Sequence, residues 1–346
     1  MLVVFCVVLG ALLGGCASCR YLWQAGLGQL ELSNKARPVA EVVADERTPP
    51  GLGGLLSRIP DIKKFGEKHG LRATKNYEHY VQLDRKAAVW VVSASQRLRF
   101  EPETWSFPFV GSFTYLGWFD RADADKHAAA LEARGLDVYV RAAPAYSTLG
   151  WFRDPVLSTM FSGGGDGPAA AGELANTVLH ESVHATVYIN DQSYFNESLA
   201  SFVADALTPV YLAGQYGQRS PEYEFWKKHV DNREKREERR KLMHAAYTDL
   251  AAVYNGTAPD AGKLERKNTI ISKLARDLGS EAGKINNAVV IQFKTYGSGT
   301  KNFEALLASC GGSWQRFISV VGSLTSKSFS STQQEDFSEV LTSLCR

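Results

Sequence analysis

The stretch Leu179–Ala185 reads LHESVHA and contains the pattern H-E-x-x-H. Residues four apart lie on one face of an α-helix, so His180 and His184 are expected to point in the same direction. Two imidazoles placed in this way can bind a zinc ion, and Glu181 beside them can reach a metal-bound water as its general base. The alternative is a helix that carries two unrelated histidines and an exposed glutamate.

A catalytic zinc site needs a third protein ligand and an open fourth position. The polar run 190–193 suits a turn, and Asn196 suits the N-cap of a second helix. Glu197 would then lie in the first turn of that helix, and an antiparallel helix pair would return it to the two histidines. Its alternative role is to complement the helix dipole. Asp205, two turns along, either orients a ligand histidine or lies on the surface.

These motifs resemble the glutamate-type zinc metallopeptidases of the thermolysin-like branch. More narrowly, the chain resembles a family of predicted zinc aminopeptidases that occur as bacterial envelope lipoproteins. The resemblance implies a zinc-dependent aminopeptidase that acts on a peptide or protein substrate. The stretches that carry it cover nearly the whole chain beyond its N-terminal run: Gly28–Leu30, Trp105–Gly111, Tyr146–Phe152, Asp154-Pro155, His180–His184, Asn196-Glu197 and Asn286–Ala288.

The order of the expected elements indicates an α+β fold that is mostly helical and zincin-like, with a small sheet over the H-E-x-x-H helix. Short strands at 87–92, 113–116 and 137–141 and a helix at 121–134 precede that helix. Further helices follow it. The sequence contains no internal repeat or low-complexity linker, which favours one unit.

We therefore divide the chain into a signal peptide at residues 1–15 and one peptidase unit at 16–346. Within that unit, a helical and sheet part is expected at about 20–165. The metal site and the remaining helices are expected at about 166–346.

Two other stretches are candidates for contact with substrate. Tyr146 and Ser147 follow the third expected strand, and zinc peptidases bind extended substrates along an edge strand. The alternative is a connector with an aromatic plug. Asn287 belongs to the family's Asn-Asn-Ala stretch, and Tyr296 follows it. Peptidases of this branch often use a tyrosine or histidine to stabilise the oxyanion, which makes Tyr296 a catalytic candidate. The alternatives are a helix cap and a core aromatic residue.

The N-terminal 15 residues are apolar and end in Leu13-Gly14-Gly15 before Cys16, like a lipobox. This run is too short to cross a bilayer as a helix. No lysine or arginine precedes it, which is unusual for a signal peptide. We expect acylation of Cys16 and a lipid anchor on the periplasmic face of the outer membrane, because no acidic retention residue follows.

Cys310 and Cys345 are the cysteines far beyond this run, and they either pair in an oxidising envelope or remain buried thiols. The resemblance also implies cysteines where this chain has Ser106 and Ser112, and therefore a disulfide that this chain lacks. The net charge of +2 gives no nucleic-acid-binding footprint.

The sequence thus predicts a zinc peptidase with His180, His184 and Glu197 as ligands and Glu181 as base. The nearest alternative is an endopeptidase of the envelope. The alternative from another class is a non-catalytic envelope lipoprotein whose zinc site is structural or vestigial, although a purely structural site has no use for a base at Glu181.

Overall fold

The structure is a computed structural model that describes residues 16–107, 111–148, 153–231, 233–281, 283–295, 299–342 and 344. These residues form a mostly helical α+β fold with small sheets of two or three strands, which confirms the expected fold class. No helix within these ranges combines the length and the apolar character needed to cross a membrane.

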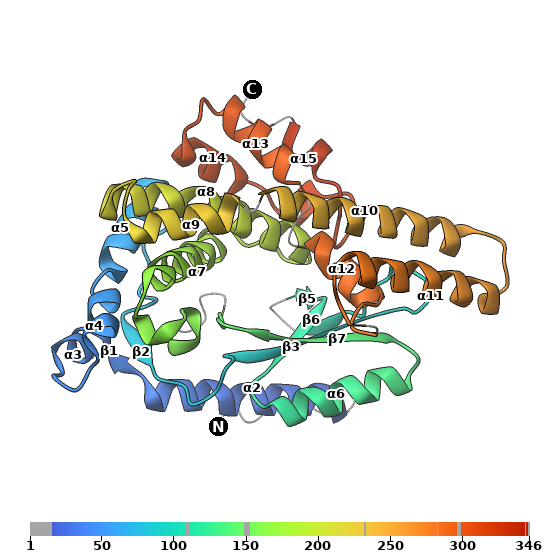
Figure 1. Ribbon diagram of the computed structural model, residues 1–346, viewed down its shortest axis with the longest axis horizontal. Coiled ribbons are helices and arrows are strands. Elements are labelled where there is room, and N and C mark those ends of the chain that lie inside the picture. The colour runs from blue at the N-terminus through green and yellow to red at the C-terminus, as the bar shows by residue number, and fades with distance from the viewer. Residues whose placement is uncertain are drawn as a thin grey trace.

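The elements are named as in Figure 1. The helices are α2 (Cys16–Lys35), α3 (Val39–Ala44), α4 (Pro50–Leu56), α5 (Ile59–Lys68), α6 (Arg121–Ala133), α7 (Pro168–Thr186), α8 (Ser193–Tyr216), α9 (Pro221–Asp231), α10 (Arg233–Asn255), α11 (Asp260–Asp277), α12 (Asn287–Thr295), α13 (Thr300–Ser309), α14 (Trp314–Val321) and α15 (Ser338–Thr342). The strands are β1 (Arg37–Pro38), β2 (His79–Val81), β3 (Val89–Ser95), β4 (Trp105–Phe107), β5 (Gly111–Phe113), β6 (Tyr115–Trp118), β7 (Asp137–Ala143) and β8 (Val156–Leu157). Single 3-10 turns occur at η1 (Ser158–Met160), η2 (Gly163–Gly165) and η3 (Ser326–Ser328).

The central sheet is antiparallel in the order β6-β3-β7. Side chains alternate between the two faces of a strand, so Val92 and Trp118 lie on the face that packs against α6 in a small core. Val89 and Val91 lie on the other face, which looks toward α7 and α8 (Figure 1). The expected order of strands, α6 and the H-E-x-x-H helix α7 is therefore present.

The helix α7 begins with Pro168 in its first turn and is buried along much of its length. Gly172 lets α9 approach closely, because a Cβ atom there would lie 2.5 Å from the ring of Trp226. The main hydrophobic core continues from Leu32 in α2 to Leu341 in α15. A rigid scaffold thus surrounds the H-E-x-x-H segment.

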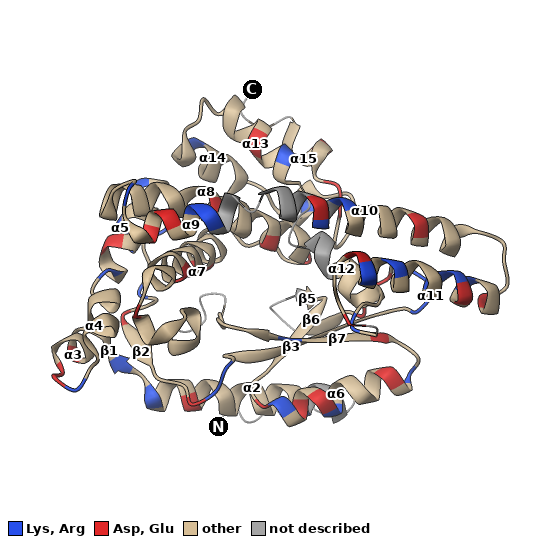
Figure 2. Cartoon of the chain, viewed as in Figure 1, with Lys and Arg blue, Asp and Glu red and all other residues tan. Residues whose placement is uncertain are grey.

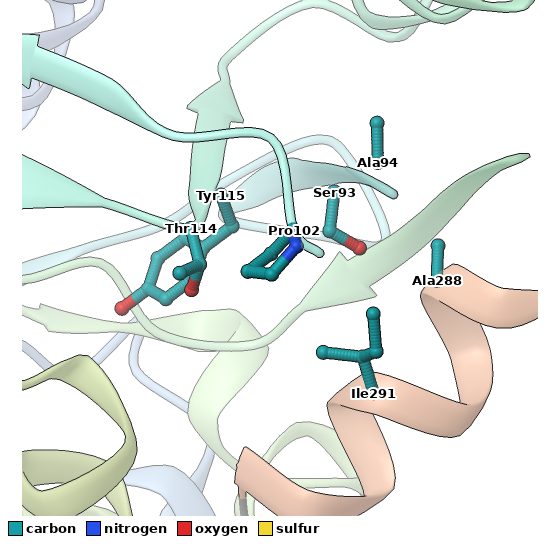
Figure 3. A pocket seen from close by; sticks show the side chains of 7 residues that line it. All are labelled: Ser93, Ala94, Pro102, Thr114, Tyr115, Ala288 and Ile291. Atoms are coloured by element: carbon teal, nitrogen blue, oxygen red, sulfur yellow. The ribbon is translucent and has the colours of Figure 1, made fainter. Parts of the chain in front are cut away.

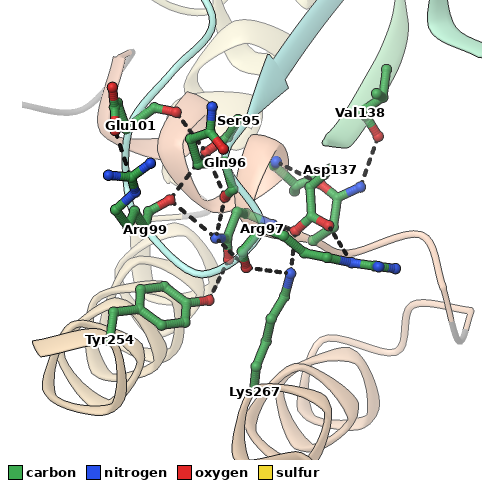
Figure 4. Close-up of polar contacts among 12 residues, drawn as sticks. Ser95, Gln96, Arg97, Arg99, Glu101, Asp137, Val138, Tyr254 and Lys267 are labelled. Carbon is green, nitrogen blue, oxygen red and sulfur yellow. Dashed lines mark hydrogen bonds and ion pairs between the residues drawn. The ribbon is translucent and has the colours of Figure 1, made fainter. Parts of the chain in front are cut away.

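The helices α10 and α11 form an arm that joins the sheet through a buried polar network (Figure 4). Lys267 of α11 forms an ion pair with Asp137 at the start of β7 and donates to the carbonyl of Arg97 at 2.9 Å. Asn287 of α12 donates to three carbonyls in the turn after β3 and accepts from the hydroxyl of Tyr254 at 2.7 Å. This network fixes one end of β7.

The two ends of the described chain contact other parts of the fold. The first helix ends at Lys35, because Pro38 continues in extended backbone as β1 before α3 begins. The last helix begins at Ser338. Before it, Gln333 and Gln334 bind the turn between α7 and α8: Gln333 accepts from the N–H of Ser193 at 2.9 Å.

Candidate metal centre and cavity

Three side chains converge where α7 and α8 meet. The Nε2 atoms of His180 and His184, one turn apart on α7, are 3.2 Å from each other. The carboxylate of Glu197 on α8 lies 3.5 Å from the first of these atoms and 3.7 Å from the second. One donor atom from each residue lies within 4.8 Å of the others, so the three residues form a possible metal-binding triad.

The turn between the two helices explains how Glu197 returns to the histidines. The helix α8 begins at Ser193, so Asn196 is not its N-cap as expected. Asn196 is buried instead, and its side-chain amide accepts from the N–H of Ile189 at 3.0 Å and donates to the carbonyl of Ile189 at 2.8 Å. This clamp fixes the turn, and Glu197, one residue further on, is held toward α7.

Burial and charge act against each other within the triad. Burial raises the pKa of the Glu197 carboxyl, but hydrogen bonding from His180 and the charges of both histidines outweigh this and lower the pKa to about 2. Burial lowers the pKa of His184 to about 4. Burial also lowers the pKa of His180, but its hydrogen bond with Glu197 and that negative charge bring the net shift upward. The carboxylate therefore stays ionised, and His184 stays neutral, as metal ligands must be.

Glu181 lies next to the triad and is not part of it. Its Oε2 atom is buried and forms no hydrogen bond with the described residues. Burial raises the pKa of Glu181 to about 7, and the negative charges of Glu197 and Asp154 add to this effect, against the opposing charge of His180. An orphaned buried carboxylate oxygen beside two imidazoles and a second carboxylate fits a site that holds a metal ion and moves a proton.

No sequence pattern indicates the part that Tyr115 plays at the triad. Its hydroxyl donates to Oε1 of Glu197 at 2.8 Å and links the sheet to the triad. Tyr115 belongs to β6, 82 residues away along the chain, and no local pattern marks it. Tyr115, Ala288 and Ile291 are among the residues that line a small cavity of about 10 Å³. Figure 3 shows the ring of Tyr115 pointing away from Ala288 and Ile291 of α12. The alternation of side chains between the two faces of β6 was the one signal available for Tyr115. That alternation does not show which helix each face of the strand meets.

The triad opens into a cavity of about 730 Å³ between the sheet and the helices. This volume is within the range that binds small ligands and short peptides. The cavity is mainly apolar and aromatic, and Arg141 is the one lysine or arginine among its described lining residues. Those residues include Tyr21, Leu22, Val89, Val91, Phe107, Phe113, Tyr115, Arg141, Tyr146, Ser147, Thr148, Asn176, His180, Glu181, His184, Tyr188 and Glu197.

Both substrate candidates that follow β7 line this cavity. Tyr146 packs edge-on against Phe119, with ring centroids 4.9 Å apart. Ser147 donates to Asp154 at 3.2 Å, and the backbone and hydroxyl of Thr148 donate to the same carboxylate. Asp154 therefore holds this loop in place through hydrogen bonds, although it does not itself line the cavity. The role of Tyr146 and Ser147 toward substrate remains a prediction.

The other sequence-derived candidates lie elsewhere. Asn287 is completely buried, is hydrogen-bonded to Tyr254 and to the turn after β3, and does not line the cavity, so the structure gives it a scaffold role in place of substrate contact. Asp205 is exposed and accepts from Asn176 at 3.1 Å, and its charge raises the pKa of His180. Tyr296 lies outside the described residues.

The cysteines are partly described. Cys16 is the first residue of α2, and its side chain is not described. Cys310 is buried and disulfide-bonded, whereas Cys345 lies outside the described residues. Pairing between Cys310 and Cys345 therefore stays a prediction.

The geometry thus joins a possible metal-binding triad, a carboxylate of raised pKa and a cavity large enough for a peptide, as a peptidase requires. A family model described as "Putative aminopeptidase" matches residues 20–335. Since this match covers most of the chain, the chain belongs to that family, and a peptidase role follows at the level of the family's description. No protein of curated function and no solved structure matches the chain.

Proposed function

We propose that this chain is a zinc-dependent peptidase, and specifically an aminopeptidase. The observation that carries the proposal is the convergence of His180, His184 and Glu197 within 4.8 Å, with the buried carboxylate of Glu181 beside them. Two imidazole nitrogens and one carboxylate oxygen are the donor set of a catalytic zinc site with an open fourth position. When bound, zinc would supply Lewis acidity to water and to the scissile carbonyl.

In this proposal, Glu181 moves the proton. Its carboxylate accepts a proton from the attacking water and later donates that proton to the leaving amine. A pKa of about 7 suits both steps, because a base near the working pH is ionised often enough to accept and acidic enough to donate. Tyr115 and Asn196 hold Glu197 in position, and the apolar wall of the cavity excludes water from the peptide.

The test compares Glu181→Gln with Glu173→Gln, which alters a glutamate on the same helix that accepts from the N–H of Ser162 at 2.6 Å. We expect Glu181→Gln to keep its zinc, measured by elemental analysis, and to lose hydrolysis of peptides by about a thousandfold. Glu173→Gln should keep both. Hydrolysis by Glu181→Gln at the parent rate would reject the assigned base, and a parent chain that binds no zinc would reject the metal.

An endopeptidase is the second candidate, and one observation favours it. Glu181 and Glu197 are the acidic side chains among the described residues that line the cavity, and both already have a role at the metal. An aminopeptidase needs a further anionic contact for the α-ammonium group of its substrate. Peptides with a free amine and their acetylated forms separate the two activities. Faster cleavage of acetylated peptides would establish the endopeptidase.

We further propose that the protein is anchored through acylated Cys16 to the periplasmic face of the outer membrane, which the lipobox-like residues before it support. Labelling with a radioactive fatty acid tests the anchor. Incorporation should be lost in Cys16→Ser, and labelling that persists in this variant would place acylation elsewhere. Sucrose-gradient separation of the two membranes tests the location.

A further inference from the structure

The outer face of α2 exposes a continuous apolar surface. Trp23, Leu27 and Leu30 are 69%, 51% and 55% exposed, and their spacing of four and three residues places them on one side of the helix. Leu22, at 50%, lies at the edge of this group. The other large apolar side chains that the described residues expose are Val43 (39%), Val210 (51%) and Phe225 (43%), which lie on other helices. Clustering of this kind marks a contact surface.

The opposite face of α2 is fixed to the sheet, so the helix cannot turn to hide this surface. Gln24 donates to the carbonyl of Gly117 and accepts from the N–H of Phe119, both at 3.1 Å. Gly28 packs so closely on Phe119 that a Cβ atom would lie 2.1 Å from its ring, and Leu32 is buried in the main core. The apolar outer face is therefore a permanent feature of the fold.

We propose that this outer face, formed by Leu22, Trp23, Leu27 and Leu30, lies in the surface of a phospholipid bilayer. The apolar run of residues 1–15 ends at Cys16, the first residue of α2, so acylation of Cys16, as proposed above, would place the lipid chains at the end of the helix that carries this face. Trp is favoured at the interface between lipid and water, and an apolar helix face of this kind lies in the plane of that interface.

The charges of α2 stand at its ends and do not interrupt the face. Arg20 pairs with Asp123 of α6, and Glu31 pairs with Lys35 and with Arg85. Figure 2 shows the middle of α2 without charged residues at the edge of the molecule, beside α6, which carries both signs. A bilayer accepts such a face along three turns, with the paired charges remaining in water.

The contact of α2 with the bilayer also indicates where the substrate lies, and this step rests on the proposed peptidase function. Leu22 belongs both to the exposed face and to the lining of the cavity, and Tyr21 beside it also lines the cavity. The entrance of the cavity therefore borders the bilayer. We infer that the enzyme acts on peptide segments held at the membrane surface.

The first experiment measures contact with lipid. The full chain, purified from bacterial membranes and reconstituted into vesicles of phosphatidylethanolamine and phosphatidylglycerol, is compared with and without brominated acyl chains, which quench nearby tryptophan. The sequence contains 7 tryptophans. Most of the quenching should disappear in Trp23→Phe. As a control, Val210→Trp in that background adds a tryptophan at a position where valine is 51% exposed, on α8 across the molecule (Figure 1), and should restore none of it. Equal quenching with and without Trp23 would overturn the proposal.

The second experiment separates this inference from the peptidase assignment. The triple variant Trp23→Gln, Leu27→Gln, Leu30→Gln should hydrolyse a soluble peptide within about twofold of the parent rate, since these side chains do not line the cavity. Hydrolysis of a vesicle-bound peptide should fall by about tenfold or more, because the apolar contact with lipid is lost. If sedimentation shows instead that the variant turns a dimer into a monomer, the face binds a second copy and the proposal is wrong. If the parent chain hydrolyses neither peptide, the proposed peptidase function is wrong, and the contact with lipid is still tested by the quenching experiment.

Discussion

The two walls of the cavity are built from the sequence in different ways. The helical wall takes its triad from one segment of 18 residues (180 to 197), folded back by a turn that Asn196 clamps. The sheet wall takes Tyr115 from β6, Arg141 from β7 and Tyr146 from the loop beyond, and it borders on Tyr21 of α2. The residues of this second wall, and Tyr21 beside it, come from stretches far apart along the chain.

The helical wall depends on residue spacing within one segment, whereas the sheet wall depends on how distant strands pair. Helical periodicity fixes the relative placement of His180 and His184 whatever the rest of the chain does, so the chemistry of the helical wall can be inferred from spacing. The sheet wall exists only after β6, β3 and β7 have paired in register, because each strand exposes alternate residues to the cavity. We expect mutations to act on metal binding through the first wall and through the Tyr115 hydrogen bond that reaches it, and on stability and substrate through the rest of the second wall.

The strongest test of this division is Glu197→Ala. If the helical wall alone holds the metal, zinc content should fall from about one ion per chain to almost none, since a catalytic zinc requires three protein ligands. Asp205→Asn, on the same helix and hydrogen-bonded to Asn176, should retain the ion and serves as the control. Elemental analysis after dialysis gives the result. Zinc retained by Glu197→Ala would mean that the sheet wall supplies a ligand, and the division would fail.

A second prediction concerns the support of the sheet wall at β7. Lys267→Met removes the buried ammonium that pairs with Asp137 and leaves that carboxylate with the N–H of Asn287 and the more distant Arg97, which should lower the free energy of unfolding by about 3 kcal/mol. The control is Lys273→Met on the same helix, which breaks an exposed pair with Asp277 and should cost less than about 1 kcal/mol. Denaturant unfolding measures both. Zinc affinity of the folded Lys267→Met chain should be unchanged, and a large loss of affinity would show that the two walls are not independent.

The contrast between the helical wall and the sheet wall explains how much of the structure could be predicted from the sequence. The class of fold, the strand–helix order before α7 and the placement of Glu197 beside the histidines followed from periodicity and from turn and cap residues. The predicted role of Asn196 was nevertheless wrong, because Asn196 clamps the turn before α8 and is not the N-cap of that helix.

Long-range contacts were the part that the sequence did not reveal. Nothing near Tyr115 indicates that its hydroxyl meets a carboxylate 82 residues later. Asn287 was expected at the substrate because its stretch carries the family resemblance, yet it joins α12 to the turn after β3 and to Tyr254. A motif shows that a residue matters, and only the assembled strands show whether it contacts substrate or holds the scaffold.

Tyr115→Phe tests the hydrogen bond that joins the sheet wall to Glu197. Loss of the 2.8 Å bond to Glu197 should weaken zinc binding by about tenfold to a hundredfold, because a partner that orients a ligand contributes that much to affinity. Tyr146→Phe removes a hydroxyl from the same cavity and should leave zinc affinity unchanged. Competition with a chelator of known affinity measures both. Equal zinc affinities for Tyr115→Phe and the parent would show that the helical wall positions Glu197 unaided.

The smallest expected effect comes from a cross-link in the sheet wall. Ser106 and Ser112 lie directly opposite each other in the β4–β5 hairpin, so their Cα atoms are within the range that a disulfide spans. Ser106→Cys with Ser112→Cys should oxidise to a disulfide that closes a short loop, worth about 2 kcal/mol. The lost hydrogen bond from Ser112 to Asp191 offsets about 1 kcal/mol of this. A net gain of about 1 kcal/mol is therefore expected.

Thermal unfolding of the oxidised double variant, compared with Ser106→Cys alone under the same conditions, measures this gain. The single variant is needed because Cys310 is itself disulfide-bonded and would respond to any reductant. Free thiols in the double variant after oxidation would contradict the register of the hairpin. Phe107 and Phe113 of this hairpin line the cavity, so the cross-link also reports on function. If kcat/KM falls when the disulfide forms and zinc content does not, the sheet wall moves during turnover while the helical wall keeps the metal in place.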